Sequence, residues 1–193
     1  MNILAIIPAR GGSKRLKRKN IRNVLGKPML SYAIDACKNS KHNITCYVSS
    51  EDEEIKKIAS KLGAKVHHRN LKFSDDKTYK QIVVAAAVKS ICSSSMSRPD
   101  LVISLQPNSP EILSCHIDDA IEVKQKFGIK EIFTVDNNLM QNGAFRIMDY
   151  DTVFLNTLSM YCGVFICDIL DVHTEDDLVN VEKNIMMSLK NEI

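Results

Sequence analysis

Seven basic side chains lie close together near the amino terminus, and no acidic residue interrupts them. They are Arg10, Lys14, Arg15, Lys17, Arg18, Lys19 and Arg22. Like charges at this density repel one another unless an anion lies among them. Gly11 and Gly12 allow backbone N–H groups to approach such an anion closely, and Ser13 adds a hydroxyl donor beside the mobile charge of Lys14. The segment therefore carries the groups that a triphosphate site requires.

A basic run of this kind can also be a solvated surface loop or a patch that binds nucleic acid. This run directly follows an apolar segment at residues 3–7 and carries no aromatic side chains for base stacking. The net charge of the whole chain is only +3, which argues against a nucleic-acid partner. The run matches neither the Walker loop nor the G-x-G-x-x-G pattern, so ATPases and dinucleotide-binding proteins lose support.

Short apolar runs alternate along the chain with longer helical patterns. Strands are expected at residues 3–7, 44–48, 64–67, 101–105, 131–135 and 144–148, with a further apolar stretch at 160–167. Helices are expected at residues 28–38, 52–61, 78–91 and 117–127, and after Thr174, which with Asp177 resembles a capping box. The alternation predicts a three-layer, doubly wound α/β fold with a mostly parallel sheet. Ligands of such sheets bind beyond the carboxyl ends of the strands, so we expect the site in the loops after Ile7, Leu105 and Cys167.

The composition fits one domain over residues 1–193, since 45% of the residues are hydrophobic, 25% are charged and no linker or repeat divides the chain. The six cysteines lack C-x-x-C spacing, which predicts buried, reduced thiols rather than a zinc site or disulfides. The first apolar run stops at Pro8, too early for a signal peptide or a membrane span. We therefore expect a cytoplasmic protein without a membrane partner.

Three blocks in order carry a family resemblance: residues 6–15 (IIPARGGSKR), Lys19-Asn20 and residues 26–28 (GKP). They resemble the opening signature of the cytidylyltransferases that make CMP-sialic acid and related CMP-nonulosonates. The resemblance implies a nucleotide-diphospho-sugar transferase (Rossmann-like) fold. It also implies that a cytidylyl group passes from CTP to an acidic sugar, sialic or a related nonulosonic acid, with release of pyrophosphate. It assigns Arg10, Ser13, Lys14 and Lys19 to the phosphates, and Asn20 to the ribose and phosphates.

Two further blocks extend the resemblance to the base and the sugar. Residues 105–110 (LQPNSP) are similar to the family's L-Q-P-T-S-P turn, which implies that Gln106 contacts the acceptor. The family usually continues with Leu-Arg, where this chain has Glu111-Ile112. Arg69 resembles the first residue of an R-P-x-x-L segment that recognises cytosine. Taken alone, a glutamine at a strand end is commonly a loop hydrogen bonder, and a loop arginine is commonly a surface residue.

Residues 170–178 (LDVHTEDDL) resemble a D-I-D-T-E-E-D-L block whose first two acids bind a divalent metal. Asp171 matches the first acid, and His173 stands in place of the second. The resemblance implies Mg²⁺ at Asp171 and His173, with Mn²⁺ as the alternative because an imidazole nitrogen is softer than a carboxylate oxygen. The other interpretation is that Asp171 only precedes a helix and His173 is a surface imidazole.

The resemblance is weakest around residues 136–142, where the family has a longer segment with basic sugar contacts and an arm that crosses to a partner subunit. A homodimer is therefore implied by the family, while the segment that would form it is short here. Two alternatives remain open: a nucleotidyltransferase of this fold with another acceptor, and a catalytically weakened protein that binds CTP without turnover.

Overall fold

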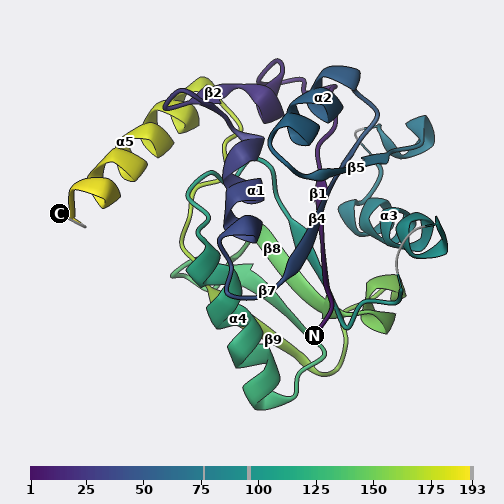
Figure 1. Ribbon diagram of the computed structural model, residues 1–193. Coiled ribbons are helices and arrows are strands. Elements are labelled where there is room, and N and C mark those ends of the chain that lie inside the picture. Colours follow the sequence, from purple (N-terminus) through teal and green to yellow (C-terminus); the bar gives the residue numbers. More distant parts are fainter. Residues whose placement is uncertain (76, 95–96, 192–193) are drawn as a thin grey trace.

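The computed structural model describes residues 1–75, 77–94 and 97–191, and within them one sheet of seven strands forms the centre of the fold (Figure 1). These strands are β1 (Ile3–Pro8), β4 (Ile44–Ser50), β5 (Lys65–His68), β6 (Leu101–Leu105), β7 (Glu131–Val135), β8 (Gln141–Asp149) and β9 (Cys162–Ile166). Their order is β5-β4-β1-β6-β8-β7-β9. Strand β8 is antiparallel to both of its neighbours, and all other adjacent pairs are parallel. The predicted mostly parallel sheet is confirmed.

Helices cover both faces of this sheet (Figure 1). They are α1 (Leu30–Lys38), α2 (Glu53–Lys61), α3 (Lys80–Ser94), α4 (Ser114–Phe127) and α5 (Glu175–Asn191). Successive side chains of a strand point to opposite faces, so Ile3 and Ile7 of β1 join the core beneath α1, α2 and α4. Leu4 and Ile6 join a second core beneath α3. The three-layer α/β prediction is therefore confirmed.

The order of the strands creates a crevice beside β1. The chain leaves β1 for β4 and β5 on one side, then returns to β6 on the other side. The loops that follow β1 and β6 consequently run in opposite directions from the same edge of the sheet. This is the place where the sequence predicted the site.

Element boundaries differ from the prediction by up to three residues at α1, α3, α4 and β8. The change at α1 has a clear structural cause. The helix begins at Leu30 rather than at Pro28, because residues 27–28 pair with residues 23–24 in a two-stranded ribbon, β2 (Asn23–Val24) and β3 (Lys27–Pro28). The turn between these strands places Leu25 and Gly26 at φ values of 47° and 82°, a region that favours glycine. The apolar stretch at 160–167 contains β9. Three short 3₁₀ helices complete the fold: η1 (Lys19–Ile21), η2 (Leu71–Phe73) and η3 (Asp151–Phe154).

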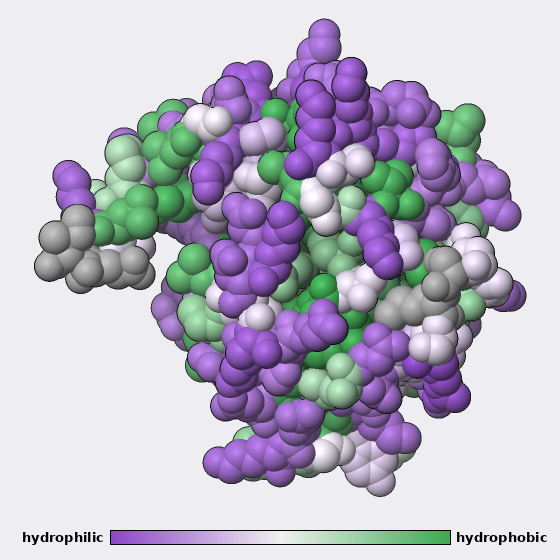
Figure 2. Space-filling model, viewed as in Figure 1, coloured by the Kyte–Doolittle hydropathy of each residue, from purple (hydrophilic) through white to green (hydrophobic). Residues whose placement is uncertain are grey.

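The start of α5 confirms the predicted cap. The backbone N–H of Asp177 donates to Thr174 Oγ1 over 3.2 Å, and the N–H of Thr174 donates back to Asp177 Oδ2 over 2.8 Å. The first turns of α5 pack through Leu178 and Val181 on a small core formed by the loop after β1 and the ribbon. Its later turns project from the body, and Met187 is 62% exposed there (Figures 1 and 2).

All six cysteines are free, as the spacing predicted, but not all are buried. Cys37, Cys46 and Cys167 are buried, whereas Cys115 near the start of α4 is exposed. The expectation that every thiol is buried is wrong for Cys115, because it lies on the solvent side of a helix whose inner face is formed by Ile117 and Ile121. None of the helices in the described ranges combines the length and the apolar character needed to cross a membrane.

Candidate functional site

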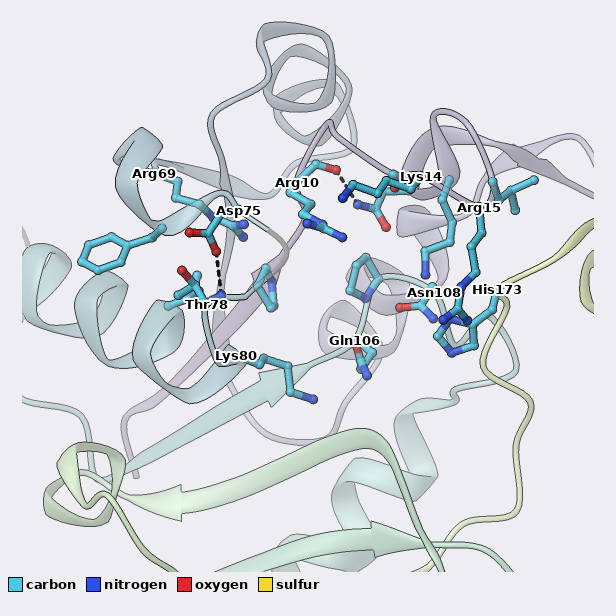
Figure 3. Close-up of a pocket in the computed structure, with 18 residues that line it drawn as sticks. Arg10, Lys14, Arg15, Arg69, Asp75, Thr78, Lys80, Gln106, Asn108 and His173 are labelled. Carbon is cyan, nitrogen blue, oxygen red and sulfur yellow. Dashed lines mark hydrogen bonds between the residues drawn. The ribbon is translucent and has the colours of Figure 1, made fainter.

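A cavity of about 570 Å³ opens at the carboxyl ends of β1 and β6 (Figure 3). It brings together side chains from the loop after β1, the segment between β5 and α3, the loop after β6 and the segment before α5. The predicted residues among its lining are Arg10, Ser13, Lys14, Lys19, Asn20, Arg69, Gln106 and His173. Residues from four distant parts of the sequence therefore meet in one place, as the family blocks require.

The basic run divides into two groups with different surroundings. Four of its members line the cavity: Arg10, Lys14, Arg15 and Lys19. Arg18 instead pairs with Asp52, with Nη1 and Oδ2 separated by 2.6 Å, and Arg22 pairs with Glu175. The sequence analysis interpreted all seven cations as one anion site. In the structure, the ion pairs of Arg18 and Arg22 instead anchor the loop to α2 and α5.

The loop is held from behind by two side chains. Asn20 is buried and donates from Nδ2 to the carbonyl oxygen of Arg10 over 2.9 Å. Glu51 at the end of β4 accepts the N–H of Gly11 at Oε1 over 2.8 Å. A Cβ on Gly11 would lie 2.4 Å from Asp52 Oδ2, so the loop can approach α2 only with glycine at this position. By contrast, nothing lies within 4 Å of a Cβ on Gly12.

Lys19 lies deeper in the site than its position in a basic loop suggested. Burial lowers the pKa of Lys19, and the charge of Arg10 acts in the same direction, while Asp171 opposes both. An ammonium in this position is poorly hydrated, so its attraction to an anion is less weakened by water. Lys19 therefore has the surroundings of a ligand-binding cation.

Arg69 is a buried side chain, with only 8% of its surface exposed. Its Nη2 donates to the carbonyl oxygen of Ser49 over 2.8 Å, and its Nη1 lies 4.0 Å from Glu51 Oε2. Its Nε has no hydrogen-bond partner among the described residues. A guanidinium held in place with a donor left over can recognise a planar group with acceptors. The surface alternative for Arg69 is wrong.

Gln106 lies on the lower side of the cavity as drawn in Figure 3, near Lys80 from the start of α3. Its backbone N–H donates to the carbonyl oxygen of Ala144 over 2.9 Å, which ties the loop after β6 to β8. Gly143 of β8 leaves room for the two side chains. A Cβ there would lie 3.2 Å from Gln106 Nε2 and 3.6 Å from Lys80 Nζ.

Asp171 and His173 belong to the extended segment between β9 and α5. His173 lines the cavity, whereas Asp171 is not among the lining residues and accepts a short hydrogen bond from the hydroxyl of Ser109. Burial raises the pKa of Asp171, while Ser109 and the nearby charge of His173 oppose that shift. No group of three or more His, Cys, Asp or Glu side chains that could hold a metal occurs within residues 1–75, 77–94 and 97–191. Asp171 and His173 would supply one oxygen and one nitrogen donor here.

The segment that carries Asp171 is fastened to the loop after β6. Asn108 accepts the N–H of Val172 at its carbonyl oxygen over 2.8 Å and donates from Nδ2 to the carbonyl oxygen of Val172 over 3.1 Å. Glu111, the residue that departs from the family pattern, accepts the N–H of Leu170 at Oε2 over 2.6 Å. The acid at position 111 therefore has a structural partner.

Several lining residues carried no clear signal in the sequence. Lys80, Asn108 and Thr78 line the cavity, and Ser109 contacts Asp171. Asn108 and Ser109 lie inside the LQPNSP block and could have been singled out there. Lys80 could have been noticed as a cation at the start of an otherwise apolar helix pattern.

Comparisons with known proteins identify the family of the chain. A family model described as cytidylyltransferase matches residues 4–152. Pseudaminic acid cytidylyltransferase of Campylobacter jejuni is 42% identical over 134 residues, which cover 66% of this chain and 56% of that protein. N-acylneuraminate cytidylyltransferase of Oncorhynchus mykiss is 31% identical over 136 residues, which cover 69% of this chain and 30% of that protein. The chain thus spans about half the length of these relatives, or less.

A solved structure of CMP:2-keto-3-deoxy-manno-octonic acid synthetase complexed with CTP has the same fold. The two structures superpose with a TM-score of 0.75 over 97% of this chain and 100% of that one, at 14% sequence identity. The family resemblance predicted from the loop after β1 is confirmed.

Proposed function

Because the chain belongs to the cytidylyltransferase family, we propose that it transfers a cytidylyl group from CTP to an acidic sugar of the nonulosonic class. The observation that carries this proposal is the cavity beside β1, where four cations of one loop face Arg69 and Gln106. Residues 1–193 would act as one catalytic domain in the cytoplasm.

In the proposed reaction, the anomeric hydroxyl oxygen of the acceptor attacks the α-phosphorus of CTP. The bond between that phosphorus and the oxygen bridging to the β-phosphorus breaks, pyrophosphate leaves and the hydroxyl proton passes to solvent water. Arg10, Lys14 and Lys19 neutralise the charge that grows on the phosphates, and the hydroxyl of Ser13 and the backbone at Gly12 add donors. Catalysis would come from in-line positioning and charge stabilisation rather than from a covalent intermediate.

Arg69 is proposed to recognise the cytosine. Its buried guanidinium has a donor without a protein partner, and cytosine presents acceptors along one edge. Asn20 would keep the phosphate loop in shape through its bond to Arg10 while it contacts the nucleotide. Gln106, at the other side of the cavity, would contact the acceptor sugar.

A divalent ion fits the donors between β9 and α5. Protein sites for Mg²⁺ commonly supply one or two carboxylates and leave the remaining positions to substrate phosphates and water. Asp171 and His173 would hold the ion, as Mg²⁺ or, given the imidazole, Mn²⁺. When bound, the ion would neutralise charge on the phosphate oxygens. Ser109 orients Asp171 for this role through its hydrogen bond.

Pyrophosphate release tests the proposal. CTP, UTP, ATP and GTP are supplied in turn with N-acetylneuraminic acid, pseudaminic acid or 2-keto-3-deoxy-manno-octonic acid, in the presence of Mg²⁺ or Mn²⁺. Release with CTP and one of these acids is expected. CTP binding without release would instead support the catalytically weakened alternative, and release only with a neutral sugar or a sugar phosphate would identify another acceptor. Light scattering of the same preparation tests whether the chain forms the homodimer that the family resemblance implies.

A further inference from the structure

We propose that Lys80 binds the carboxylate of the acceptor and makes the enzyme specific for acidic sugars, an inference that rests on the proposed function. The resemblance assigned Gln106 to the sugar but gave the site no cation on that side. Lys80 Nζ lies beside Gln106, and both side chains face the free space next to Gly143. An ammonium and an amide N–H₂ side by side can hold the two oxygens of one carboxylate.

Within residues 1–75, 77–94 and 97–191, Lys80 forms no ion pair with an acid. Its Nζ donates to the carbonyl oxygen of Gly143 over 3.2 Å, and among the described residues no carboxylate lies within ion-pair distance of it. Arg146, whose charge lowers the pKa of Lys80, is by contrast paired with Glu131. A poorly solvated charge without a counter-ion destabilises the protein until an anion binds.

The position of Lys80 in its helix adds to this destabilisation of the unliganded protein. Lys80 is the first residue of α3, and a cation is unfavourable at that end of a helix because the backbone dipoles place positive charge there. Burial lowers the pKa of Lys80, Asp171 opposes that shift, and the charge of Arg146 adds to it. An anion beside Nζ would compensate for the lost hydration of the ammonium and for the repulsion by Arg146.

The geometry assigns this anion to the acceptor rather than to the triphosphate, because the proposed phosphate-binding cations come from the loop after β1. Figure 3 shows Arg10 and Lys14 on the upper side of the cavity, and Lys80 with Gln106 on the lower side. The acceptor must approach the α-phosphorus from the side opposite the leaving pyrophosphate. A carboxylate on the acceptor can therefore reach Lys80 while the nucleotide occupies the loop.

The experiment compares an acid with its neutral analogue. Wild-type enzyme is assayed with CTP and the acid among those above that it converts best, and then with the C1 carboxamide of that acid. In the Lys80→Gln variant we expect kcat/KM for the acid to fall about 30-fold, while kcat/KM for the carboxamide and KM for CTP change less than about threefold. The variant Lys80→Arg should recover part of the preference for the acid.

Lys89→Gln is the matched control, since Lys89 lies on the same helix and is exposed to solvent. It should behave as wild type with both acceptors, and thermal melting should show that every variant is folded. Equal losses for the acid and the carboxamide, or a raised KM for CTP alone, would overturn the role of Lys80 but leave the cytidylyltransferase proposal intact. Wild-type enzyme that converts none of the acids would overturn both.

Discussion

The hydroxyl of Ser109, in the loop after β6, donates a hydrogen bond to the carboxylate of Asp171, in the segment before α5. Two loops that each follow a different strand are joined at this point, and Asn108 and Glu111 fasten the same two segments on either side of it. These contacts fix the position of Asp171. A carboxylate that is to hold a metal ion beside a nucleotide must be oriented in this way.

The first prediction concerns this hydrogen bond. Ser109→Ala should raise the Mg²⁺ concentration needed for half-maximal activity about tenfold, because side chains that orient a metal ligand typically change metal affinity by that order. Ser109→Thr keeps the hydroxyl and serves as the control. Titrating activity with Mg²⁺ at saturating CTP gives the comparison, and equal midpoints for Ser109→Ala and wild type would show that Asp171 needs no support.

A second prediction separates the two groups within the basic run. Lys14→Ala and Lys19→Ala should each lower kcat by about 10² to 10³, since each removes a cation from the charge that develops on the phosphates. Lys17→Ala should leave kcat unchanged, because Lys17 is exposed and does not line the cavity. The measurement is the initial rate of each variant and of wild type at saturating CTP. Similar rates in all three variants would mean that the run is only a charged surface.

The choice of nucleotide provides a third prediction. Calorimetry should show CTP binding in preference to ATP and GTP, and Arg69→Gln should weaken CTP binding about 30-fold by removing a buried, charged donor. Arg98→Gln is a suitable control, since Arg98 pairs with Asp151 on the surface, away from the cavity. If ATP bound wild-type protein as tightly as CTP, the role of Arg69 would be refuted even if the phosphate loop kept its function.

His173, in the segment before α5, leads to a fourth prediction. Wild-type enzyme should be more active with Mn²⁺ than with Mg²⁺, and His173→Asp should shift the preference toward Mg²⁺ by restoring a second oxygen ligand. Asp171→Asn should abolish turnover with either ion. Initial rates are measured for the three proteins in each metal. Were His173→Asp to match wild type in both, His173 would lie outside the coordination sphere.

Thiol reactivity is the fifth prediction. Burial, with smaller effects of Cys115 and Asp168, raises the pKa of Cys167 to about 12, so almost none of it is the reactive thiolate at neutral pH. Cys115 is exposed and should be alkylated first by iodoacetamide. Peptide mass spectrometry after timed labelling should find Cys167 modified only in denaturant. Early modification of Cys167 in folded protein would contradict its burial.

The sequence alone determined the fold class, the family and most of the basic loop that lines the cavity. Strand and helix positions follow from local periodicity, and the blocks from residue 6 to residue 28 are contiguous, so both can be recognised without knowing which segments meet. For the same reason Arg10, Lys14 and Lys19 were found, and the start of α5 was placed at Thr174 and Asp177.

The tertiary structure decided which partners each of these residues has. Arg18 and Lys19 are adjacent in the chain, yet one pairs with Asp52 and the other faces the cavity near Asp171. Lys80 became a candidate only when α3 placed it beside Gln106, with no ion-pair partner among the described residues. Charge and burial depend on neighbours that are distant in sequence, and the packing of strands and helices alone brings those neighbours together.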